Sequence, residues 1–167
     1  MLPISRIIHQ LIVDLGLAEE TDGSWPIYTS FLADKPHEAI CVYETGGLPD
    51  GRMMRTGEKI EHKGIQIQVR GRVFPDTQQK AVAIAEALDT QGNILIAVGD
   101  SDAYLIHNIS RPGTILYMGI DEKEDRRRHY FSINALVTIP NYEDFTVRIT
   151  EDGTFRIVES ERYLINP

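Results

Sequence analysis

Residues 65–73 carry the pattern that most constrains the fold, a strict alternation of apolar and polar side chains. Successive side chains of a strand point to opposite faces, so this pattern predicts a strand with one face on a hydrophobic core. Its other face meets solvent or a partner. The apolar positions are Ile65, Ile67, Val69, Gly71 and Val73, and the polar ones are Gln66, Gln68, Arg70 and Arg72.

Two segments have the helical periodicity needed to cover such a strand. Residues 4–15 carry an apolar stripe at helical spacing, with His9 between polar neighbours on the side predicted to face solvent. Residues 75–88 form the second predicted helix, with Asp76 as its N-cap and Gln79 completing a capping box. The two stripes consist of Ile4, Ile7, Ile8, Leu11, Ile12 and Leu15, and of Ala81, Ile84, Ala85 and Leu88.

The remaining patterned segments are β-type. Helices that are segregated from runs of strands indicate an α+β fold, with two helices packed on one face of a mostly antiparallel β-sheet. We expect residues 1–139 to form this α+β domain and residues 140–167 to add a C-terminal β-hairpin to the same domain. The predicted strands are 39–44, 93–98, 102–109, 114–120 and 129–139, with a short edge strand before residue 37.

Residues 44–63 are predicted to be a long loop arm. The segment ETGGLPDGR is dense in turn-forming residues, and the stretch after it has no clean period. We expect this arm to be flexible and to become ordered against a neighbouring molecule. Its key residues are Gly46, Gly47, Met53, Met54 and Arg55.

The composition restricts the class of protein. A chain of 167 residues suits one domain, and its 17 basic against 25 acidic residues give a net charge of −8. Proteins that bind nucleic acid non-specifically usually carry a net positive charge, so this composition argues against that class.

The single cysteine, Cys41, lies in an apolar run and is expected to be buried. Without a leader or a membrane-length apolar run, the sequence predicts a protein of a reducing cytoplasm.

Motifs for chemistry are absent from the sequence. It contains no P-loop, nucleophile elbow or H-E-x-x-H motif, and its five histidines have no ligand spacing. We therefore predict no catalytic residue, no cofactor and no metal site. A nucleophilic pair of Cys41 with a histidine is the enzyme alternative.

Residues 121–128 form a block of mixed charge, DEKEDRRR, that is neutral overall. Three interpretations remain open: a solvated turn, a salt-bridge patch against a protein partner, and a contact with nucleic acid. Arginine suits the second because its planar fork pairs with carboxylates in a bidentate manner. The charged residues considered are Asp121, Glu122, Glu124, Asp125, Arg126, Arg127 and Arg128.

Three motifs over residues 1–139 resemble the minor capsid protein family of long-tailed phages, whose members are similar to tail terminators. The first holds Phe31, Pro36, the strand 40–43, the turn 44–47 and Pro49-Asp50. The second holds Val69, Arg70 and Gly71 before a helix, and the third holds Gly119, Asp121, Arg128, Phe131, Ser132 and Asn134. The sequence departs from the family pattern in three respects. Glu44 stands where the family usually has aspartate, the basic run at 126–128 is longer than usual, and the predicted hairpin at 141–162 extends past the usual end of the family.

The resemblance implies a structural role in a virion. Such proteins form a ring, typically of six subunits, at the junction of tail and head, after assembly in the host cytoplasm. The ring ends tube growth, contacts the tail tube protein and the head connector, and lets DNA pass through its lumen without specific binding. In that setting Arg70, Arg72 and the block 121–128 are predicted to form the subunit interface.

Three other functions are retained as alternatives. The chain could be another head–tail neck protein of the same fold, a small α+β enzyme, or a DNA-binding accessory protein.

Overall fold

The computed structural model describes residues 2–20, 23–52, 59–99, 102–123 and 126–140, together with the backbone of two C-terminal strands. Its helices are α1 (Ile4–Asp14) and α2 (Phe74–Asp89). None of the described helices is long and apolar enough to cross a membrane. The strands are β1 (Ile27–Thr29), β2 (Ala39–Arg52), β3 (Lys59–Gly71), β4 (Gly92–Val98), β5 (Asp102–Ser110), β6 (Leu116–Lys123), β7 (Arg126–Pro140), β8 (Phe145–Ile149) and β9 (Phe155–Glu159).

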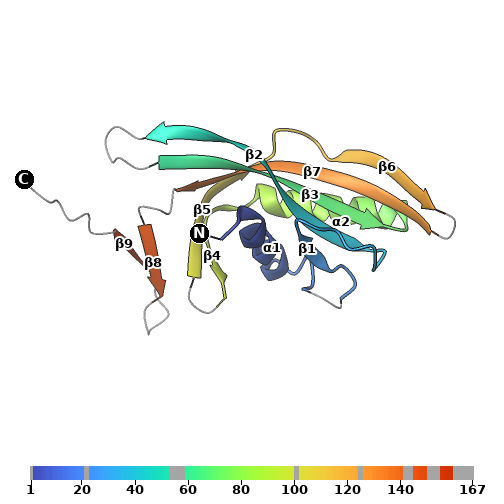
Figure 1. The fold of residues 1–167 in the computed structure, drawn as a ribbon, viewed down its shortest axis with the longest axis horizontal. Helices are drawn as coiled ribbons and strands as arrows, with labels where there is room; N and C mark the ends of the chain where they lie inside the picture. Colours follow the sequence, from blue (N-terminus) through green and yellow to red (C-terminus); the bar gives the residue numbers. More distant parts are fainter. Residues whose placement is uncertain are drawn as a thin grey trace, which may run out of the picture.

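A seven-stranded sheet in the order β1-β2-β3-β7-β5-β4 forms the body of the molecule, with β6 paired to β7 beside this path (Figure 1). Every pairing in it is antiparallel except that of β1 with β2. The long strand β7 pairs with β3 along one side. Two strands share the other side of β7: β6 pairs with its residues 126–132, and β5 pairs with its residues 136–138. The start of β7 therefore carries β6 as an edge strand.

Both helices lie on the same side of the sheet (Figure 1) and contribute to one hydrophobic core. Ile65, Ile67 and Val69 of β3 are fully buried in that core, whereas Gln66 and Gln68 between them are only half-buried on the outer face. The alternation in residues 65–69 therefore faces the helices on one side, as predicted. The α+β class is confirmed.

The start of α1 is capped by a residue from the sheet. Pro3 occupies the N-cap position and has no side chain that can accept a hydrogen bond. The carboxylate of Glu44 in β2 instead accepts bonds from the backbone N–H and the hydroxyl of Ser5, at 3.2 and 3.1 Å. A negative charge at a helix N-terminus is favourable because it pairs with the exposed N–H groups and the helix dipole.

The prediction that His9 faces solvent was wrong. Only 8% of His9 is exposed, and its Nδ1 atom has no hydrogen-bond partner within the described part of the chain. Burial, with a smaller contribution from Arg6, lowers the pKa of His9 below its ordinary value of 6.5. The buried face of α1 is thus wider than its aliphatic stripe indicated.

The second helix also begins before the predicted residue. Val73 is its N-cap and Pro75 lies in the first turn, so Asp76 falls inside the helix rather than capping it. Proline is common in the first turn of helices, because the backbone N–H that it lacks would have no partner within the helix there. The hydroxyl of Thr77 donates to the carbonyl of Val73 at 2.7 Å and closes the first turn.

The prediction of a loop arm for residues 44–63 was wrong at both of its ends, because residues 44–52 continue β2 and residues 59–63 begin β3, and the two segments pair as far as Arg52↔Lys59. Two register irregularities absorb the turn-forming residues. Gly47 and Gly64 allow the two backbones to approach, since a Cβ atom at either glycine would collide with a carbonyl of the facing strand. Met53, Met54 and Arg55 lie outside the described residues.

Strands β8 and β9 pair antiparallel in a two-stranded sheet of their own, with Phe145 opposite Glu159 and Ile149 opposite Phe155.

Candidate interaction surface

The charged block at 121–128 lies at the end of the β6–β7 hairpin. Its residues 121–123 and 126–128 belong to strands, so the interpretation as a turn was wrong for them. Glu124 and Asp125 lie outside the described residues. The pairing sets Asp121 opposite Arg128 and Glu122 opposite Arg127, so that acids of one strand face bases of the other.

Arg127 and Glu122 form an exposed ion pair on this hairpin. The Nε of Arg127 lies 3.4 Å from Oε1 of Glu122, and about two-thirds of each side chain is exposed, at 66% and 67%. Water screens such a pair, so it contributes little to the stability of the protomer. Both groups remain accessible to a partner.

Arg128 behaves differently, since only 1% of it is exposed. Its guanidinium donates to Oδ1 of Asp34 at 3.0 Å, to the carbonyl of Asp34 at 2.5 Å, and to Nδ1 of His37 at 3.1 Å. A buried cation is tolerated when its donors are matched in this way by an anion and further acceptors.

Arg70 is 2% exposed and holds the same loop from the neighbouring strand β3. Its guanidinium donates to the carbonyls of Ala33 at 2.7 Å, Pro36 at 2.5 Å and His37 at 3.2 Å. Arg70 and Arg128 therefore fasten residues 33–37, the clamped loop, onto the outer face of the sheet. Within the protomer both arginines bind their own chain, and a contact with a second subunit stays a prediction for them.

Arg72 completes this arrangement from an exposed position. Its Nη2 atom lies 2.9 Å from Nε2 of His37, and its backbone N–H lies 3.4 Å from Oε1 of Glu38. Burial lowers the pKa of His37, and the nearby Arg72 and Arg128 lower it further. A lowered pKa favours the neutral imidazole, the form in which Nδ1 can accept from Arg128.

An apolar surface on β6 was missed from the sequence. Leu116, Met118 and Ile120 are 58%, 50% and 41% exposed, although they belong to a strand. The run LYMGI has no polar residue to point outward, and that missing alternation was the available signal. Val73 and Phe74, at the start of α2, are also exposed.

Aromatic contacts join α2 to this surface. The ring of Phe74 meets Tyr117 edge-on at 5.2 Å and lies 5.4 Å from Phe131. The hydroxyl of Tyr117 is hydrogen-bonded to Nδ1 of His129 at 3.0 Å. These contacts place the rings of Phe74 and Tyr117 on the helix-facing side of the sheet, beside Phe131 of β7.

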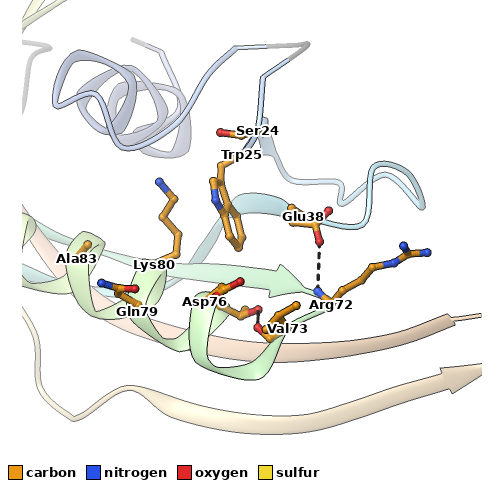
Figure 2. Close-up of a pocket in the computed structure, with 10 residues that line it drawn as sticks. Ser24, Trp25, Glu38, Arg72, Val73, Asp76, Gln79, Lys80 and Ala83 are labelled. Atoms are coloured by element: carbon orange, nitrogen blue, oxygen red, sulfur yellow. Dashed lines mark hydrogen bonds between the residues drawn. The ribbon is translucent and has the colours of Figure 1, made fainter.

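A cleft of about 740 Å³ opens beside the first turns of α2, where Trp25, Glu38, Arg72 and Lys80 surround it (Figure 2). The Lys80 ammonium lies 5.5 Å from the centre of the Trp25 ring, and burial lowers the pKa of Lys80. The walls carry both signs of charge. In the described ranges no group of three or more His, Cys, Asp or Glu residues could hold a metal ion.

Residues 11–139 match the model of a family described as "Bacteriophage tail terminator protein". No curated protein matches the sequence. Among solved structures, one similar chain comes from "Virion of native gene transfer agent (GTA) particle". It is 10% identical, covers 69% of this chain and 78% of its own length, and has a TM-score of 0.36.

Proposed function

This chain belongs to the bacteriophage tail terminator family, and from that premise we propose that it forms a ring that caps the tail tube. In this proposal the ring has six subunits and joins the tail to the head connector. The observation that carries the proposal is the family match over residues 11–139, which spans the end of α1, all of α2 and nearly all of the seven-stranded sheet.

The surface of the protomer supports an assembling protein. Exposed apolar side chains gather on β6, and exposed charges of both signs lie on the adjoining hairpin. Interfaces between proteins combine an apolar centre with a polar rim in this way. We therefore keep Asp121, Glu122 and Arg127 as interface residues of the proposed ring, together with Arg72.

The charge of the chain suits the passage of DNA through the ring. The net charge is −8, and two arginines that could bind phosphate, Arg70 and Arg128, are buried against the clamped loop. Phosphate binding requires accessible cations, so DNA would pass without being held. The proposed partners are thus the tail tube protein and the head connector.

The test is co-assembly with the tail tube protein of the same phage. Tubes polymerised with the protein should have it at one end and stop growing, whereas tubes polymerised alone should continue to lengthen. Electron microscopy of tube length and light scattering of the free protein measure both effects. Tubes that lengthen equally, with the protein left in solution, would refute the proposal. Binding to the connector but not to the tube would instead identify another neck protein.

A further inference from the structure

We propose that Arg72 and His37 form a binding site for an anion, and that the group it takes is a carboxylate of a protein partner. Arg72 directly follows strand β3 and is exposed. Its guanidinium points away from Trp25 and out of the cleft beside α2 (Figure 2). The site belongs to one protomer and does not depend on a ring. Only the step that the partner is a virion protein rests on the proposed function.

The buried Arg128 fixes the hydrogen-bonding role of His37. The Nε of Arg128 donates to Nδ1 of His37 at 3.1 Å, while its other two nitrogens donate to Asp34. Buried donors keep their acceptors, because water cannot replace a lost partner there. Nδ1 therefore accepts, and the neutral imidazole carries its proton on Nε2.

Arg72 presents a second donor to the same ring. Its Nη2 lies 2.9 Å from Nε2 of His37, and a guanidinium has donors only. Two N–H groups thus face each other with no acceptor between them. The opposite tautomer would only move this deficit to the buried Nε of Arg128. Within the described residues the guanidinium of Arg72 forms no ion pair with a carboxylate, so the missing acceptor must be supplied by water or a ligand.

The charges around His37 favour an anion over water as this acceptor. Burial is the largest cause of the lowered pKa of His37. Arg72, Arg128 and Arg70 lower this pKa further, and Glu38 opposes them. The ring is therefore in a positive field from three guanidinium groups. An anion that accepts from Arg72 and from Nε2–H gains from this field, and its charge strengthens both hydrogen bonds.

The site fits a carboxylate better than the phosphates of DNA. Its two donor groups match the two oxygens of a carboxylate, and a planar guanidinium pairs with carboxylates in a fixed orientation. Two acids lie close by: Oε1 of Glu38 is 3.4 Å from the backbone N of Arg72, and Asp34 is 65% exposed. They repel a doubly charged or polymeric anion more than a single carboxylate. Binding of DNA also requires several accessible cations.

The first test is an NMR titration of the free protein with sodium acetate at pH 8, against sodium chloride at equal ionic strength. The imidazole nitrogen signals of His37 should show the proton on Nε2, and acetate should shift them to saturation. Arg72→Gln should lose this saturable shift. The control Arg6→Gln, which removes an exposed arginine of α1, should retain it. Equal thermal unfolding midpoints would show that both variants are folded.

Three results of this titration would overturn the site. They are a proton on Nδ1, no saturable response to acetate in the natural protein, and a response that survives Arg72→Gln. Inorganic phosphate and a short DNA duplex, at the same ionic strength, separate the two chemistries. Both should bind with lower affinity than acetate. Tighter binding of either one, lost in Arg72→Gln, would overturn the assignment to a carboxylate.

The variant Arg72→Glu tests the partner, in co-assembly with the tail tube protein and with the head connector. It should need at least about tenfold more protein to bind one of them, because two carboxylates then face each other. A lysine in place of the paired acid on that partner should restore binding. Unchanged binding to both would overturn the partner assignment. If the natural protein binds neither, the proposed function fails, whereas the acetate titration still decides the anion site.

Discussion

Arg127 and Arg128 are adjacent in the sequence, but one side chain is exposed and the other is buried. Successive strand residues face opposite sides of the sheet, and the side of Arg128 lies under the clamped loop. Arg128 is 1% exposed and bound to Asp34 and His37, whereas Arg127 is 66% exposed and paired with Glu122. Two adjacent arginines thus have different roles: Arg128 binds the clamped loop inside the protomer, and Arg127 carries an exposed charge.

We predict that Arg128→Met lowers the free energy of unfolding by about 2–3 kcal/mol, because it removes a charged donor from several acceptors. Asp34 is 65% exposed, so water can re-solvate its carboxylate and limits the loss. The matched control is Arg127→Met, which should change stability by less than about 0.5 kcal/mol. Urea denaturation of both variants measures the difference. Equal effects of the two substitutions would contradict the internal role of Arg128.

His9 makes the stability depend on pH. Burial first, and then Arg6, lowers the pKa of His9 in the folded protein below its ordinary value of 6.5, while Glu20 opposes this effect. The unfolded chain therefore binds a proton more readily than the folded one between the lowered pKa and 6.5. Stability must rise with pH across that window and fall as the pH drops through it.

The substitution His9→Leu should remove this part of the pH dependence, because leucine does not titrate. It also removes the Nδ1 atom that has no partner within the described residues. We expect the variant to lose less stability than the natural protein when the pH is lowered from 8 to 5. Urea denaturation at several pH values measures the slope, and an unchanged slope would show that His9 is not responsible.

At the scale of elements, the start of α1 depends on strand β2. The helix has no capping side chain of its own and no acidic residue in its first turn, so Glu44 supplies the acceptor across the packing interface. The sequence pattern predicted that β2 ends at Glu44 and that a loop begins there. Pairing of Glu44 with Ile65 keeps it in the sheet and places its carboxylate next to Ser5.

We predict that Glu44→Ala destabilises the protein by about 1 kcal/mol, the usual effect of losing a helix cap and its charge. The control is Thr45→Ala, at the next exposed position of the same strand, which should have a smaller effect. Thermal or urea unfolding measures both. The prediction fails if the two alanine variants are equally stable, since the carboxylate would then contribute nothing to the helix.

At the scale of the whole molecule, the sheet separates two kinds of surface. The helices cover its inner face, while the clamped loop covers part of the outer face and buries two arginines there. Exposed large apolar side chains lie on β6 and at the start of α2, and Phe31 and Leu48 are exposed at separate positions on the β1–β2 side of the sheet. This distribution favours association with other proteins over binding of DNA.

The α+β class, both helices and most strands were predictable from the sequence, because the periodicities of helices and strands are local properties. It also carried the family resemblance, which the match over residues 11–139 confirms. Errors arose where distant segments meet. His9 is buried by packing, residues 44–52 become a strand by pairing with β3, and Arg128 binds Asp34 across 94 residues. Only the tertiary structure decides such contacts, because the partner of each group is chosen by the folded arrangement and not by its neighbours in the chain.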